Sequence, residues 1–240
     1  MTSLFSRVQS KLRSEHGFTL LEVSFVITIF AVMASIVLFR FKDFGAKTAF
    51  DNLIQDVALH IVQAQKSAIS GTLNPNFTDT NNPPSYGMFF QTSASDPIAD
   101  PLTHQFTYFT DIPPLGTTRG NGVYDPTSGC PSTPTVGNEC LSTTSITSGE
   151  YVSKLCWVAL DGTQGCSSGA MSGNITFVRP FPDATIEMCI GSGTCTAAGT
   201  GYIEFRSAVN TALAGTIVIT GLGEISVHNG PACDIVGASC

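Results

Sequence analysis

Eight cysteines carry the most obvious chemistry of this 240-residue chain, because paired thiols form disulfides and clustered thiolates bind metal ions. All eight lie in the second half of the sequence, separated by turn-forming Gly, Pro and Ser residues. No C-x-x-C motif is present and no histidine lies near a cysteine at ligand spacing, which favours disulfides over a metal site. The sequence does not fix the connectivity, but we expect local pairs: Cys130–Cys140, Cys156–Cys166, Cys189–Cys195 and Cys233–Cys240.

A nucleophilic serine is the second chemistry that the sequence suggests. Residues 165–169 (Gly-Cys-Ser-Ser-Gly) match G-x-S-x-G, a motif that places a serine between a buried strand and a helix. The residues that follow show no helical period and a cysteine lies inside the motif, so a turn beside a disulfide is the better interpretation. The four histidines form no H-E-x-x-H pair. We therefore predict no enzyme, no cofactor and no metal site.

The third group of residues surrounds the junction between Gly17 and Phe18. An apolar run of 22 residues extends from Phe18 to Phe39, with Glu22 as its only ionisable side chain. This length is enough to cross the hydrocarbon core of a bilayer as a helix. Arg7, Lys11 and Arg13 precede the junction and indicate a cytoplasmic N-terminal side.

A secretory signal peptide and a plain membrane anchor each explain only part of this segment. A secretory signal peptide has a shorter apolar core, and its small-residue cleavage site follows that core, whereas Gly17 precedes the run. A plain membrane anchor explains the length of the run but gives no reason for the carboxylate of Glu22, which is costly in lipid.

The stretch from Gly17 to Val23 (Gly-Phe-Thr-Leu-Leu-Glu-Val) resembles the signal of type IV prepilins and type II secretion pseudopilins. The resemblance implies cleavage after Gly17 by prepilin peptidase and N-methylation of Phe18. It also implies that Glu22, the fifth mature residue, faces the free amine of a neighbouring subunit. Major pseudopilins bind calcium, but residues 120–125 lack the alternating Asp and Asn with a late Glu of a specific calcium loop. We expect a turn there.

Periodicity and composition predict the helix and the domain that carry this signal. Apolar residues recur at i, i+3 and i+4 from Phe50 to Ile69, which predicts one long helix ending at Ser70-Gly71. We expect four regions: a leader (1–17), an assembly half of the helix (18–39), an amphipathic half (40–71) and a β-rich domain (72–240). The fold class is α+β, with the helix packed on an antiparallel sheet and disulfide-tied loops.

Within residues 72–240, alternating patterns predict strands, and the range 115–150 is expected to be one long irregular excursion. The clearest hairpin joins 216–220 to 224–228 through Gly221-Leu222-Gly223. The other predicted strands are 86–90, 106–110, 151–160, 175–178, 185–190 and 202–206. This strand set has a diffuse resemblance to the globular part of H-type minor pseudopilins.

The sequence thus predicts a pilin-like structural subunit, a minor one, in a type IV pilus or a type II secretion pseudopilus. A pilus-tip binding module and a major pilin remain alternatives. Expected partners are prepilin peptidase, other pilin subunits and the assembly platform of the cytoplasmic membrane. The subunit would cross that membrane once, with its C-terminal domain outside the cytoplasm, before entering the filament. A net charge of −7 without a Lys or Arg cluster argues against a nucleic-acid partner.

Overall fold

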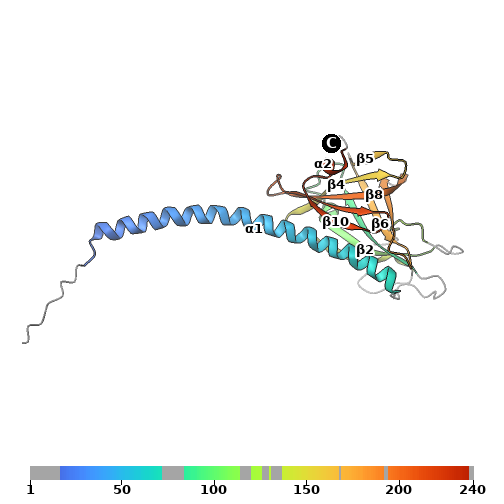
Figure 1. The fold of residues 1–240 in the computed structure, drawn as a ribbon, viewed down its shortest axis with the longest axis horizontal. Helices are drawn as coiled ribbons and strands as arrows, with labels where there is room; N and C mark the ends of the chain where they lie inside the picture. Colours follow the sequence, from blue (N-terminus) through green and yellow to red (C-terminus); the bar gives the residue numbers. More distant parts are fainter. Residues whose placement is uncertain are drawn as a thin grey trace, which may run out of the picture. The chain divides into compact units, whose positions relative to one another are not determined.

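The computed structural model describes residues 17–71, 84–113, 120–125, 130, 137–167, 169–191 and 194–237, without side-chain positions for residues 39–43. The chain divides into two compact units, one ending at Gly45 and one beginning at Ala46, and each is described by itself. The fold is α+β, as predicted (Figure 1). Its elements in chain order are α1 (Leu20–Ser70), β1 (Ser85–Thr92), η1 (Pro101–His104), β2 (Gln105–Asp111), β3 (Cys140–Ser145), β4 (Glu150–Ala159), β5 (Gln164–Cys166), β6 (Met171–Phe177), β7 (Ala184–Ile190), β8 (Thr194–Ser207), β9 (Ala214–Thr220), β10 (Ile225–Asn229) and α2 (Ala232–Val236).

Helix α1 is 51 residues long and ends where the sequence predicts. Gly71 follows its last residue with a φ of 72°, a left-handed conformation that glycine adopts without a Cβ penalty. The prediction of one long helix with a glycine stop is confirmed.

The second half of α1 packs on the sheet through the apolar face that its periodicity predicts. Phe50, Ile54, Val57 and Ile61 are each at most 2% exposed and belong to the main hydrophobic core. The prediction was wrong at Ile69, which is 49% exposed in the last turn of the helix. On the inner side, the core continues into side chains from β1, β4, β6, β7, β8 and β9.

The described strands form one antiparallel sheet, with the path β10-β9-β8-β7-β6-β1-β2-β3. Strand β8 is the longest and pairs with three neighbours: β7 along its first residues, β9 along its second half, and β4 on the opposite edge. Strand β4 also lies against β1 and β6, to which it is not hydrogen-bonded. The sheet therefore curls over itself and encloses the core.

The β pattern was predicted in outline but not in full. Each predicted strand overlaps an observed one, and the closing hairpin is β9–β10. The expectation of an irregular excursion over 115–150 was wrong for Cys140–Ser145, which form β3 at the edge of the sheet beside β2. This strand reads as a loop in the sequence because it is polar and mostly solvent-facing. The sequence also failed to indicate β5, the first half of β8 and the short helix α2.

Candidate functional site

The N-terminal junction is built around a helix cap. Gly17, Phe18 and Thr19 precede α1, and the Thr19 hydroxyl accepts a hydrogen bond from the backbone N–H of Glu22 (3.2 Å). Thr19 thus caps the first turn of α1, and Thr-x-x-Glu is the sequence pattern of a capping box. The positive end of the helix dipole also favours a carboxylate in the first turn. Sequence reasoning overlooked this capping signal, although Thr19-Leu20-Leu21-Glu22 shows it directly.

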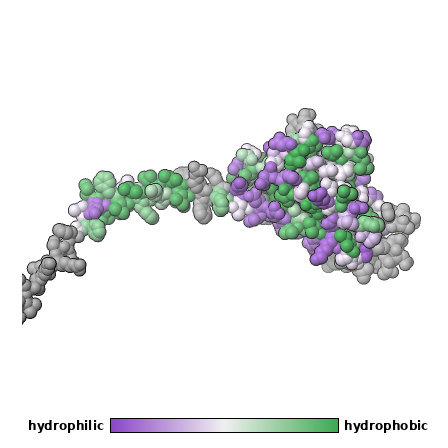
Figure 2. Space-filling model, in the orientation of Figure 1, coloured by the Kyte–Doolittle hydropathy of each residue, from purple (hydrophilic) through white to green (hydrophobic). Residues whose placement is uncertain are grey.

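The helix that follows presents apolar side chains in every direction. The stretch Leu20–Leu38 has a mean hydropathy of 2.4, and none of it is buried within the described structure. At the helical rise of about 1.5 Å per residue it spans roughly the thickness of a bilayer hydrocarbon core. Figure 2 shows this apolar surface along the helix, in contrast to the mixed surface of the β domain. A surface of this kind requires a lipid or protein environment.

The hydroxyl groups of this apolar stretch form hydrogen bonds within the helix, whereas, among the described residues, the carboxylate of Glu22 does not. The hydroxyls of Ser24, Thr28 and Ser35 donate to helix carbonyls three or four residues earlier, at 2.7–3.2 Å. Such bonds allow Ser and Thr to lie in lipid or in a helix bundle. Glu22 differs from them because it is ionisable, and its side chain is exposed. Its carboxylate is therefore the group available for a contact outside this helix.

Comparison with known proteins identifies this same segment. A family model described as the prokaryotic N-terminal methylation motif matches residues 12–38. The chain therefore carries a type IV pilin-like N-terminal signal, and a signal of this kind implies processing by a prepilin peptidase and assembly with other pilins. Comparisons with curated proteins and with solved structures gave no significant match. The resemblance to H-type minor pseudopilins stays a hypothesis.

Disulfides tie neighbouring parts of the β domain. The structure contains Cys130–Cys140, Cys156–Cys166 and Cys189–Cys195, three of the four pairs expected from the sequence. The last two join directly opposed residues of β4–β5 and β7–β8. Cys233 is disulfide-bonded as well, and its expected partner Cys240 lies outside the described residues. The sulfurs of Cys156, Cys166 and Cys233 lie within 4.8 Å of one another, but disulfide bonding leaves no thiolate there for a metal ion.

The residues considered for catalysis have structural roles where they are described. The Ser167 hydroxyl accepts a hydrogen bond from the Leu155 backbone N–H at 3.1 Å, and the next described element is a strand, β6. The His104 ring contacts the backbone oxygens of Glu150 and Ile98 at 2.8 and 2.9 Å. His60 packs edge-on against Phe106. His16 lies outside the described residues. Among the described residues, Ser167, His104 and His60 form no nucleophile–base pair, and the ring of the remaining histidine, His228, lies 3.2 Å from the Ser226 hydroxyl on the same strand, β10.

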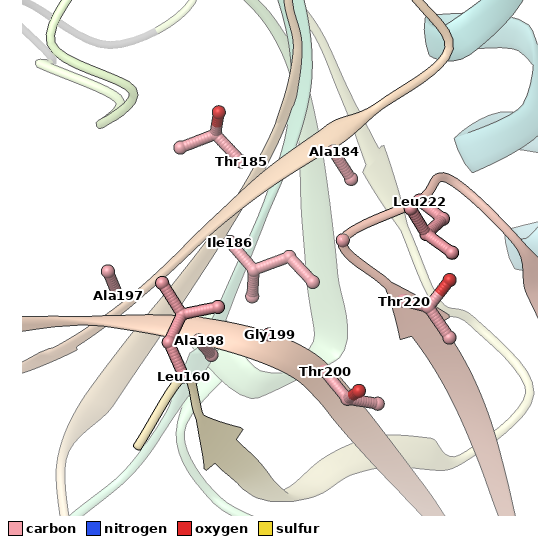
Figure 3. Close-up of a pocket in the computed structure, with 11 residues that line it drawn as sticks. Leu160, Ala184, Thr185, Ile186, Ala197, Ala198, Gly199, Thr200, Thr220 and Leu222 are labelled. Atoms are coloured by element: carbon pink, nitrogen blue, oxygen red, sulfur yellow. The ribbon is translucent and has the colours of Figure 1, made fainter. Parts of the chain in front are cut away.

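A pocket of about 580 Å³ opens where β8 changes its partner from β7 to β9. Figure 3 shows its walls: Ile186 from β7, Thr200 from β8 and Thr220 from β9, with Leu160 and Leu222 from adjoining turns. Leu160 and Leu222 are more than 80% exposed. The lining residues are Leu, Ile, Ala, Gly and Thr, so this pocket offers apolar contact and hydroxyl groups but no acid or base.

A buried carboxylate that sequence reasoning missed connects β8 to the C-terminal helix. Glu204 is fully buried; it accepts hydrogen bonds from the Ser153 hydroxyl, from Arg206 Nε (2.6 Å) and from the Ala232 backbone N–H (2.8 Å). All its described partners are donors, which compensates the cost of burying the charge. The i, i+2 spacing of Glu204 and Arg206 on one strand face is the signal that could have revealed the pair.

Proposed function

We propose that the protein is a pilin-like structural subunit that assembles through its N-terminal helix into a type IV pilus or a type II secretion pseudopilus, as a minor subunit. Cleavage after Gly17 by prepilin peptidase and N-methylation of Phe18 come first. The proposal includes no enzymatic activity, because families that carry this signal are structural subunits.

One observation supports the proposal: the first part of α1, Leu20–Leu38, is capped, apolar and unburied, has Glu22 as its single carboxylate, and lies inside the segment that the methylation-motif family matches. This helix is suited to lipid and equally suited to a bundle of similar helices. Transfer from the bilayer to a filament therefore exchanges one apolar environment for another, and close helix packing supplies the gain.

Glu22 favours the filament over the bilayer, because only the filament offers its carboxylate a partner. In an apolar environment its carboxylate attracts the free amine of a neighbouring subunit's Phe18 more strongly than it would in water. Cleavage creates that amine, so processing and assembly are coupled. In the membrane stage we infer a single crossing by residues 18–39, with residues 40–240 outside the cytoplasm and contacts to an assembly platform.

The test uses Glu22→Ala in cells that contain the peptidase and the partner pilins. The variant should insert and be cleaved normally, and mass spectrometry should find methylated Phe18 as its first residue. It should enter sheared filaments poorly, or fail to initiate them if the subunit lies at a tip. Ser24→Ala is the matched control, because that hydroxyl bonds only within the helix.

Two results would contradict the proposal. If the leader stays intact in the presence of active peptidase, the proposed cleavage after Gly17 is wrong. Wild-type amounts of Glu22→Ala in filaments, with normal initiation, would show that Glu22 is not the assembly contact.

A further inference from the structure

Two buried carboxylates hold a bend on the outer face of the sheet. Asp111 ends β2 and is 2% exposed, and Glu139 directly precedes β3 and is 6% exposed. Asp111 Oδ2 accepts the Gly122 backbone N–H at 3.0 Å. Glu139 accepts the N–H groups of Ile112 (3.0 Å) and Asp125 (2.6 Å) through its two oxygens. The two carboxylates thus hold residues 120–125 at Gly122 and at Asp125.

The centre of the bend is held by groups that do not change charge. The Asn174 side chain on β6 accepts the Tyr124 backbone N–H at 2.9 Å, and Thr176 donates to the Gly122 carbonyl at 3.0 Å. The Tyr124 ring packs against Phe89 and Phe109 with centroids 5.1 and 5.3 Å apart. None of these contacts depends on protonation at mildly acidic or neutral pH, so a pH response of the bend has to come from Asp111 and Glu139.

The surroundings of the two carboxylates are acidic. Among the described residues, the titratable groups that face them are Asp125 and Tyr124 on the bend and Glu187 on β7, which lies beside Gly122. Arg119 lies outside the described residues. Within the described part of the chain, Asp111 Oδ1 is buried without a hydrogen-bond partner. The pair is therefore buried beside the further carboxylate of Asp125, and among the described residues no basic side chain offsets its charge.

We propose that Asp111 and Glu139 form a proton-controlled clasp, which holds residues 120–125 on the sheet at mildly acidic pH and releases them when both carboxylates ionise. Ionisation places two negative charges in a poorly solvated site, and opening of the bend admits water to both. The hydrogen bonds from the bend persist in the closed state and are lost on opening.

The pKa values of the two carboxyl groups determine whether the bend opens at high or at low pH. Burial raises the pKa of Glu139 from 4.5 to about 7 and that of Asp111 from 3.8 to about 6, and the nearby acids add to both shifts. Backbone N–H donors oppose these shifts without cancelling them. A raised pKa in the closed state means that protons favour closure. The stabilisation is complete below the ordinary pKa values and is lost as pH rises through about 6 and 7.

The clasp controls the shape of a second pocket. A cavity of about 570 Å³ is lined on one side by residues 121 and 123–125 of the bend. Its opposite walls include Phe89 and Gln91 of β1 and Met171 of β6. Release of the bend removes one wall of this cavity, so the surface that it offers to a partner depends on pH.

Hydrogen exchange of the full-length protein in detergent tests the clasp. Protection of the amides in 120–125, corrected for intrinsic exchange, should fall by roughly tenfold or more between about pH 5 and about pH 8, since each pKa unit of differential protonation is worth about tenfold. Amides of β9 serve as the internal reference and should keep constant protection. Asp111→Asn combined with Glu139→Gln should abolish the pH dependence. Asp161→Asn, an exposed turn carboxylate, should leave it intact.

The outcomes separate a proton response from other causes. Constant protection of 120–125 in the wild-type protein would overturn the proposal, even if the double variant failed to fold. A pH response that persists in a folded double variant would overturn it too. The profile should be the same in EDTA and with added calcium; a response that requires calcium would assign the two carboxylates to cation binding instead.

Discussion

Gly215 on β9 gives the packing of α1 on the sheet a direct test. A Cβ added at Gly215 would overlap Ile54 Cδ1 and lie 3.2 Å from Phe50 Cε1. Gly215 does not have a positive φ, so alanine is compatible with its backbone and the effect of the substitution comes from packing. Gly215→Ala should therefore destabilise the β domain by about 1–3 kcal/mol, the usual cost of one excess methyl group in a close-packed core.

The same contact predicts a compensating change on the helix. Ile54→Val removes Cδ1, the atom that the new Cβ would meet, and alone should cost about 0.5–1.5 kcal/mol. In the double variant the methyl group has moved from the helix to the strand, and total volume is kept. Its destabilisation should be smaller than the sum of the single effects by about 1 kcal/mol or more, as expected for residues in contact.

Thermal unfolding followed by fluorescence of Trp157, the only tryptophan, provides the measurement. For a domain of this size each kcal/mol corresponds to about 2–4 °C in Tm. Ile69→Val makes the same chemical change at a half-exposed position of the same helix and should shift Tm very little. Strictly additive effects of Gly215→Ala and Ile54→Val would refute the described packing of α1 on β9.

Two further changes probe the C-terminal half of the β domain. Glu204→Ala leaves the buried N–H of Ala232 without an acceptor; it should destabilise the protein by about 1–3 kcal/mol and speed amide exchange in α2, and unchanged exchange there would contradict the link. Replacing Cys189 and Cys195 by Ser opens a loop with a sequence separation of 6, which should cost about 2 kcal/mol by the chain-entropy relation; a variant as stable as the parent in thermal unfolding would show that β-pairing alone holds this hairpin.

The parts of the fold that could be predicted are those with a strong period. The spacing of Phe50, Ile54, Val57 and Ile61 identifies a buried helix face because 3.6 residues per turn leave few other ways to bury them. The β9–β10 hairpin was equally visible, with two alternating runs around a glycine-containing turn. The N-terminal signal was predictable for a different reason: the length of its apolar run matches a bilayer, and its Gly17-Phe18 junction and Glu22 form a local motif that does not depend on tertiary contacts.

The features that the sequence did not reveal depend on contacts with segments that are distant along the chain. Strand β3 is polar and solvent-facing, so only its pairing with β2 makes it a strand. Asp111 and Glu139 read as ordinary loop acids, because their burial comes from the bend 120–125 folding over them. Glu204 is hidden in the same way by α2. A single sequence contains no periodic signal for a side chain that is buried by a loop or by a chain terminus.

The short span of the disulfides has a mechanical consequence. The three described bonds close segments with sequence separations of only 10, 10 and 6 residues. If a force on α1 separated the strands of the β domain, these bonds would therefore leave almost the whole length of the domain's chain free to extend. Resistance to that load comes from the antiparallel hydrogen-bond ladders of β1 with β2 and β6, shared over many residues. The bonds Cys156–Cys166 and Cys189–Cys195 would keep the hairpins β4–β5 and β7–β8 closed under such a load, but they would not set the force at which the other strands separate.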